Sequence, residues 1–126
     1  MVYMFFELLD VRRYQELAAM FAPDGVWYRQ NKLLRGPEHV IEAMKQRPAG
    51  STTRLIITKV VVYFRGDDKA LASYYMTVVV REDAESPKGL VPLDLQRHVS
   101  AFVQTCVRTS EGWHTAELAG TPTFHL

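Results

Sequence analysis

The sequence lacks the residues and runs on which several classes of protein depend. It has one cysteine, Cys106, so it can form no internal disulfide, and we expect this residue to pack as a small buried side chain in a reducing cytoplasm. No apolar run approaches the roughly 18 residues that a membrane span needs. The apolar start of the chain is interrupted by Glu7 and Asp10 and has no basic segment before it, which argues against a secretory signal. We therefore predict a cytoplasmic protein with no membrane contact.

The chain also has no large excess of positive or negative charge. The 15 basic and 14 acidic residues leave a formal net charge of +1, and the longest basic grouping is the pair Arg12-Arg13. A nucleic-acid-binding protein would show a basic stripe or patch, so we expect no nucleic-acid partner. The 4 histidines have no metal-ligand spacing, and no glycine-rich phosphate loop is present. The sequence thus predicts neither a metal site nor another cofactor.

What is present is the composition of an ordinary folded domain. The chain has 126 residues, of which 48% are hydrophobic and 23% charged. These values exclude wholesale disorder and allow one substantial core. We expect a single domain over residues 1–126.

Helical periodicity occupies the first twenty or so residues. Apolar side chains recur there at spacings of three and four, and the stripe pauses at Asp10, so one bent helix and two short ones are both possible. Pro23-Asp24-Gly25 has turn chemistry and should end this region. Gly36-Pro37-Glu38 should open another helix, which Arg47 to Gly50 closes.

Strands dominate the rest of the chain. Val26 to Tyr28 and Leu33 to Arg35 are short and should pair as a hairpin across Asn31-Lys32. A polar loop is expected from residue 82 to 87, and further strands over 54–65, 70–81, 96–109 and 113–118. Helices first and an antiparallel meander afterwards is the pattern of an α+β protein.

Two of the long strands carry three consecutive valines, at 60–62 and at 78–80. A solvated sheet face would alternate with polar residues, so both faces of these strands should be covered. The helices can cover one face, and we expect a second copy of the chain to cover the other, which makes a homodimer the favoured assembly. The alternative is that the chain's own termini cover that face.

The order of these elements resembles a known family. The segment from Leu17 to Met44, with Asp-Gly-Val-Trp before a hairpin and Gly-Pro-Glu at a helix start, is similar to the SnoaL-like members of the nuclear-transport-factor-2-like superfamily, and the late Gly-Trp-His-Thr-Ala-Glu-Leu continues the match. The resemblance implies a cone-shaped barrel in which amino-terminal helices pack in a strongly curved, mainly antiparallel sheet around an internal pocket. Such folds serve cyclases, dehydratases, isomerases, hydrolases, small subunits of aromatic-ring dioxygenases and binding proteins, so the fold leaves the function open.

The resemblance also suggests catalytic positions. Dehydratase-like members pair an acid, here matched by Asp10, with a histidine on the first long strand. That histidine position, directly after Arg54, is Leu55 in this chain, and leucine can neither carry a proton nor donate a hydrogen bond. A carboxylate facing an apolar cavity can serve as a general acid or base. Alternatively, Asp10 caps a helix that begins at Val11.

Other polar and aromatic side chains could complete a site. Tyr14 and His98 are further catalytic candidates, as groups that polarise or position a substrate. His98, Phe102 and Gln104 share one face of their strand and would line the pocket if that face is inward. The opposite face, with Val99, Ala101 and Val103, could equally be the inward one. Tyr74 and Tyr75 point to opposite faces, and we take Tyr75 as the ligand contact. The full predicted ligand-binding set is Trp27, Leu55, Tyr75, Phe102 and Gln104.

Three hypotheses for function follow. The first is a cofactor-independent lyase, isomerase or cyclase acting on an apolar cyclic or aromatic carbonyl compound, with Asp10, Tyr14 and His98 as its catalytic groups. The second is a noncatalytic protein that binds a small apolar ligand, which Leu55 favours because an apolar wall improves binding and removes chemistry. The third is an assembly protein like the small subunit of an aromatic-ring dioxygenase.

Overall fold

The computed structural model describes residues 1–29, 31–82 and 97–125. Most of the polar loop predicted after residue 81, and Gln96 at the start of the third predicted long strand, lie outside these residues. In the described part, no helix is long and apolar enough to cross a membrane.

The amino-terminal region forms two short helices. Helix α1 spans Val2–Asp10 and α2 spans Tyr14–Ala19, and Arg12 between them has a left-handed backbone with φ 62°. The expectation that Asp10 caps a helix beginning at Val11 is wrong, because Asp10 ends α1 and α2 has no side-chain cap. A left-handed residue interrupts the helical hydrogen-bond pattern and so lets α2 leave in a new direction.

The strands form one six-stranded sheet in the order β2-β1-β6-β5-β4-β3. Neighbouring strands are antiparallel, except that β1 and β6 run parallel. Helix α3, Gly36–Lys45, follows β2 and packs on β1 and α2. The strand bounds are Phe21–Arg29 for β1, Lys32–Arg35 for β2, Ser51–Arg65 for β3, Lys69–Glu82 for β4, Arg97–Thr109 for β5 and Gly112–His125 for β6.

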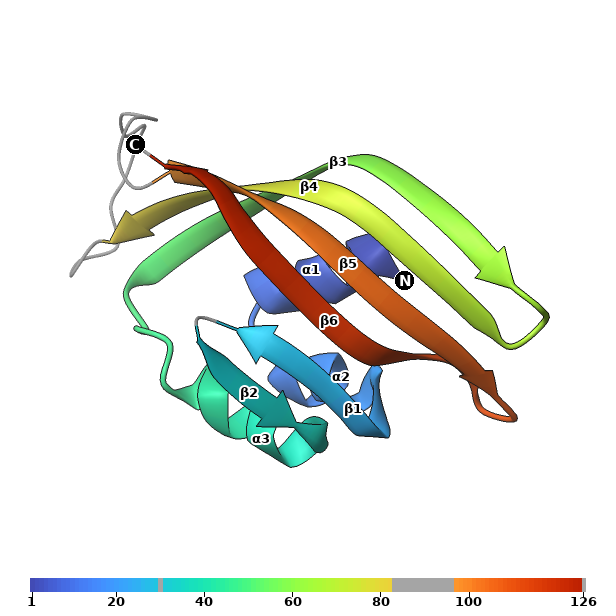
Figure 1. Ribbon diagram of the computed structural model, residues 1–126. Helices are drawn as coiled ribbons and strands as arrows, with labels where there is room; N and C mark the ends of the chain where they lie inside the picture. The colour runs from blue at the N-terminus through green and yellow to red at the C-terminus, as the bar shows by residue number, and fades with distance from the viewer. Residues whose placement is uncertain (30, 83–96, 126) are drawn as a thin grey trace.

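The predicted α+β class is confirmed, with a curved sheet that stays open (Figure 1). The sheet bends over α1, which lies against its concave face, and β2 and β3 form its two free edges. Phe5 and Phe6 project from α1 into the core, where the Phe6 ring meets those of Tyr74 and Phe102, each at a centroid distance of 5.8 Å. The apolar stripe of the first helix is therefore what the sheet wraps around.

β1 and β6 extend furthest beyond their predicted bounds, and β2, β3 and β4 are also longer than predicted. β1 begins at Phe21, so the Pro23-Asp24-Gly25 triplet lies inside the strand and coincides with a register shift between Phe21 and Val26. A Cβ on Gly25 would lie 2.7 Å from the carbonyl oxygen of Thr115, so glycine permits the close contact of β1 with β6. β6 continues to His125 and pairs with β5 from His98 to Thr109.

The outer face of the sheet carries apolar side chains that remain exposed in the described part of the chain. Ile56, Tyr75 and Val103 project from it and are 44% to 49% exposed. Val61 is also exposed, so the described residues of one copy leave this face of β3 uncovered, and its predicted coverage by a second copy stays a prediction.

Candidate functional site

A hollow of about 650 Å³ lies between the concave face of the sheet and the β1–β2 hairpin. Most of its wall is apolar, because the inward residues of β4 and β5 alternate with the outward ones. The apolar side chains that line it are Leu9, Trp27, Leu33, Leu55, Met76, Val78, Val80, Phe102 and Pro122.

Four of the predicted site residues line this hollow. Trp27 and Phe102 are buried in its wall, and Leu55 and half-buried His98 also contribute to it. The open question of the β5 register is thereby settled, since His98 and Phe102 face inward and Val103 faces outward, 44% exposed. His98 is accordingly the imidazole that the site could use for proton transfer.

Gln104 shares the inward face but lies deeper, outside the lining of the hollow. Its side chain is fully buried, where its Oε1 accepts a hydrogen bond of 2.9 Å from the Tyr74 hydroxyl and its Nε2 donates one of 2.7 Å to Thr115 Oγ1. Burial, with a smaller effect of Cys106, raises the pKa of the Tyr74 phenol. Gln104 therefore organises the core beneath the site.

The expected inward orientation of Tyr75 is wrong. Tyr75 is 45% exposed on the outer face, where Lys59 Nζ lies 5.5 Å from its ring centroid, and Tyr74 is the inward tyrosine of the pair. The inward set on β4 contains Ala72, Met76 and Val78, and Tyr74 belongs to it by alternation.

Asp10 does not line the hollow that His98 faces. Its carboxylate accepts hydrogen bonds from Thr53 Oγ1 at 2.8 Å and from the Leu55 backbone N–H at 3.3 Å. It lines an outer groove of about 320 Å³ between α1 and β3, and Leu55 lines both this groove and the hollow. Leu55 thus stands between the carboxylate and the space that His98 faces.

Tyr14 also lies outside the lining of the hollow. Its hydroxyl accepts hydrogen bonds from Arg47 Nη1 at 2.9 Å and Arg12 Nη1 at 3.3 Å. Asp10, Tyr14 and His98 therefore do not converge on one cavity.

Three cations, which the sequence analysis did not identify, line the hollow. Arg29, Lys32 and Arg47 contribute to its wall, and the same three residues line an adjoining depression of about 340 Å³. Arg29 could have been found from sequence, because it follows Trp27 by two residues on the same strand and so shares its face. Arg47 lies just beyond the end of α3, and no local sequence pattern predicts that it reaches the hollow.

The side chains in this wall that carry a full charge are all basic. Among the residues that the structure describes, neither the hollow nor the adjoining depression has an Asp or Glu in its lining. Burial and the nearby charge of Arg47 lower the pKa of Arg29, because both disfavour its charged form. A negative charge in the hollow would relieve that cost.

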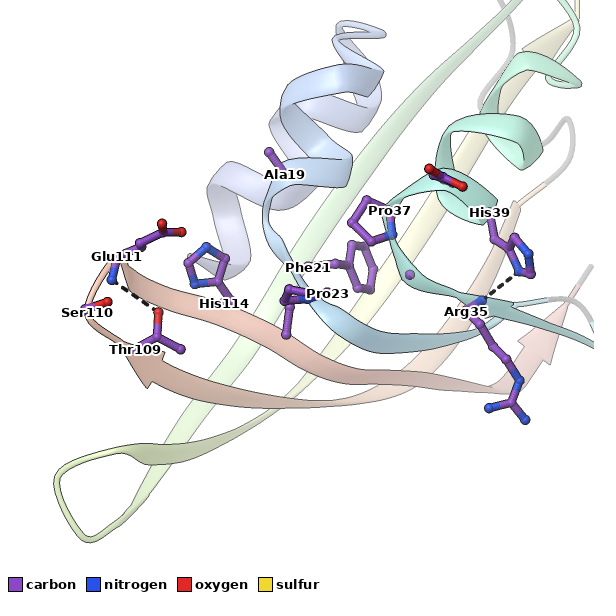
Figure 2. A pocket seen from close by; sticks show the side chains of 13 residues that line it. Ala19, Phe21, Pro23, Arg35, Pro37, His39, Thr109, Ser110, Glu111 and His114 are labelled. Atoms are coloured by element: carbon purple, nitrogen blue, oxygen red, sulfur yellow. Dashed lines mark hydrogen bonds between the residues drawn. The ribbon is translucent and has the colours of Figure 1, made fainter.

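A separate hollow of about 760 Å³ lies between the end of α2, the start of α3 and the β5–β6 turn (Figure 2). Its polar groups are partly used by the backbone, since His39 Nδ1 accepts the Arg35 N–H at 3.1 Å and Thr109 Oγ1 accepts the Glu111 N–H at 3.2 Å. None of the predicted site residues lines it. Over the described part of the chain, no cluster of His, Cys, Asp and Glu could hold a metal ion.

Several solved structures are similar to this chain over nearly its whole length. A structure from Novosphingobium aromaticivorans, named as a candidate scytalone dehydratase, superposes with a TM-score of 0.82 at 16% identity, over 99% of this chain and 80% of the other. A hexachlorocyclohexane dehydrochlorinase, LinA-type3 from Novosphingobium barchaimii, gives 0.72 at 17% identity over 94% and 79%. A protein from Catenulispora acidiphila, solved in complex with S-DNPA, gives 0.73 at 19% identity over 95% and 86%.

These identities show a shared fold. A search of curated proteins found no match to the sequence. The model of the SnoaL-like domain family matches residues 1–119, which is nearly the whole chain, and the protein therefore belongs to the SnoaL-like domain family.

Proposed function

We propose that this protein binds a small, largely apolar molecule in the hollow beneath the curved sheet. The observation that carries the proposal is the hollow itself, whose volume of about 650 Å³ falls in the usual range for ligand sites, roughly 300 to 1,000 Å³. Its wall combines the aromatic rings of Trp27 and Phe102 and other apolar side chains with polar groups that can orient a ligand, which is the composition of a pocket for a small, largely apolar compound. One relative solved with a small molecule, S-DNPA, supports ligand binding by this fold.

Binding can be tested with a neutral aromatic probe, methyl 2-naphthoate, by titration calorimetry. Val80→Trp places a large ring in the lining of the hollow, and Val79→Trp places the same ring on the opposite face of β4 as a matched control. We expect saturable binding by the natural protein, at least a tenfold loss of affinity in Val80→Trp and no change in Val79→Trp. Absence of saturable binding, or equal losses in both variants, would contradict the proposal.

A second candidate function is cofactor-free elimination on the bound compound. It is supported by the names of two similar structures, a candidate dehydratase and a dehydrochlorinase, and by His98 in the wall of the hollow. In this hypothesis the His98 imidazole takes a proton from the carbon next to a carbonyl, the carbon–oxygen bond at the β position breaks, and the imidazolium returns the proton so that water leaves. Asp10 and Tyr14, as further catalytic groups, would need the substrate to reach beyond Leu55.

Aromatic β-hydroxy ketones provide the assay, because their dehydration forms an absorbing conjugated ketone. We expect His98→Asn to abolish turnover while methyl 2-naphthoate still binds, and Asp10→Asn to retain turnover. Turnover that survives in His98→Asn would refute the assignment of His98, and no turnover with any such ketone would leave binding as the function. Loss of turnover in Asp10→Asn alone would restore the acid predicted by the family resemblance.

We also propose that the outer face of the sheet pairs with a second copy of this chain. Ile56, Val61, Tyr63, Tyr75 and Val103 share this face and are 37% to 57% exposed. The same surface patch of both copies meets in a two-fold interface, and this group of exposed apolar side chains supplies such a patch. We expect light scattering to give a dimer mass for the natural protein and a monomer mass for Val103→Lys; a monomer in both would overturn the assembly.

A further inference from the structure

The described residues that line the hollow include three cations and no carboxylate, and Asp10, which lies outside the lining, is linked to Arg47 only through Thr53 Oγ1. The three cations are Arg29, Lys32 and Arg47. The ion pairs that the described residues form lie elsewhere, between Arg13 and Glu16 and between Lys45 and Glu42. Among the described residues, Asp10 is thus linked to Arg47 through Thr53, and no carboxylate lies in the lining beside Arg29 or Lys32.

Arg47 is held by the protein itself. Its Nη1 donates to the Leu9 carbonyl at 3.0 Å and to the Tyr14 hydroxyl at 2.9 Å, and its Nη2 donates to Thr53 Oγ1 at 3.2 Å. These contacts join α1, α2 and β3 and fix the guanidinium in place. Arg47 therefore contributes a fixed positive charge to the site, with most of its donors already used.

Arg29 differs from Arg47 in having free donors. Its guanidinium lies over the ring of Trp27, whose centroid is 5.5 Å from the Arg29 Cζ. No described carboxylate, carbonyl or hydroxyl accepts a hydrogen bond from it. Arg29 is half-buried, and no fully buried side-chain nitrogen of the described residues lacks a hydrogen-bond partner, so its unpaired donors still face solvent in the hollow and are available to a ligand.

We propose that the ligand of the hollow carries a carboxylate, which Arg29 binds while the apolar body of the ligand lies against Trp27 and Phe102. The inference rests on the proposed ligand-binding function and specifies the chemical class: an aromatic or alicyclic carboxylic acid. A guanidinium offers two parallel N–H donors whose spacing matches the two oxygens of a carboxylate. Lys32 and Arg47 add to the positive potential and leave the two parallel N–H donors of Arg29 to bind the carboxylate.

Matched probes with the same ring system test the inference by titration calorimetry. The acid is 2-naphthoate, the neutral form is methyl 2-naphthoate, and 2-naphthyl phosphate is the dianionic form. The variants are Arg29→Gln, Arg29→Lys and, as a control with the same loss of charge on the outer face, Arg54→Gln. Circular dichroism establishes that each variant is folded.

We expect the natural protein to bind 2-naphthoate at least tenfold more tightly than its methyl ester. Arg29→Gln should remove this difference and leave the affinity for the ester unchanged, Arg29→Lys should keep part of it, and Arg54→Gln should have no effect. If Arg29→Gln does not fold, the natural protein and Arg29→Lys decide between the acid and the ester.

Several results would overturn the inference. Equal affinities for acid and ester would refute it while the proposed binding function stands, as would a preference for the acid that survives in Arg29→Gln. Tighter binding of the phosphate than of the carboxylate would refute the assignment to a carboxylic acid. If no probe binds, the proposed function fails and the inference fails with it.

Discussion

The buried pair of Gln104 with Tyr74 offers the sharpest test of what lies beneath the hollow. Replacing Gln104 by Leu keeps a side chain of similar size but removes both an acceptor and a donor. The Tyr74 hydroxyl then loses its acceptor at 2.9 Å, and Thr115 Oγ1 loses its donor at 2.7 Å. Both groups stay buried, because Tyr74 is 2% and Thr115 0% exposed.

The expected cost follows from the groups left without partners. A buried hydroxyl that is left without a hydrogen-bond partner lowers the free energy of unfolding by about 1 to 3 kcal/mol. Thr115 should lie at the low end, since its Oγ1 keeps a contact of 3.7 Å with the Met1 sulfur. We therefore expect Gln104→Leu to lower the free energy of unfolding by roughly 3 kcal/mol, the sum of about 2 for Tyr74 and about 1 for Thr115.

Urea unfolding of a double-mutant cycle measures the pairwise part of this cost. Gln104→Leu combined with Tyr74→Phe leaves no stranded phenol, so the double variant should be more stable than the sum of the single changes predicts, by about 1 to 2 kcal/mol. A cost below about 0.5 kcal/mol for Gln104→Leu, or no coupling, would refute this reasoning. A lower ligand affinity with unchanged stability would instead support the role predicted from sequence, in which Gln104 contacts the ligand.

Three further predictions concern groups around the same core. Gly120→Ala should lower stability by about 1 to 3 kcal/mol in thermal unfolding and weaken binding of methyl 2-naphthoate, because its Cβ would lie 2.5 Å from Phe102 Cζ and displace that ring. Asp10→Ala should cost about 1 to 2 kcal/mol without weakening binding of that probe, since it removes an acceptor from the β3 edge and no wall of the hollow. Burial raises the pKa of the Tyr74 phenol above its unfolded value of about 10, so the stabilisation from the neutral phenol is complete below pH 10 and is lost as the pH rises. Tyr74→Phe should therefore show a shallower fall in unfolding free energy above pH 10, and an unchanged slope would contradict this.

The parts of the fold that depend on local pattern were predictable. The stripe through Phe5, Leu8 and Leu9 has the spacing of a buried helix face, and each of them is buried in α1. The parallel contact of β1 with β6 was not predictable, because it joins distant segments through an irregular stretch around Gly25. Such pairing depends on backbone approach in the folded chain, which periodicity does not report.

The orientation of Tyr74 and Tyr75 shows what the alternation of side chains along a strand can and cannot predict. Alternation alone requires Tyr74 and Tyr75 to face opposite ways but does not say which faces inward. The neighbours at even positions, Ala72, Met76 and Val78, are uniformly apolar, whereas Ser73 and Thr77 accompany Tyr75. That difference was readable in the sequence and favours Tyr74 as the inward residue, as the structure shows.

The charge of the site is the property that sequence could least reveal. A net charge of +1 describes an almost neutral chain, yet the wall of the hollow is cationic because acids and bases are distributed unevenly in space. Arg29 and Lys32 flank a hairpin turn, and Arg47 lies beyond α3, so they meet only when α3 packs beneath β1. Folding, and not composition, produces the local field. Selectivity for an acid over its ester would therefore be a property of the assembled hollow, whose wall Arg29 shares with Trp27 and Phe102.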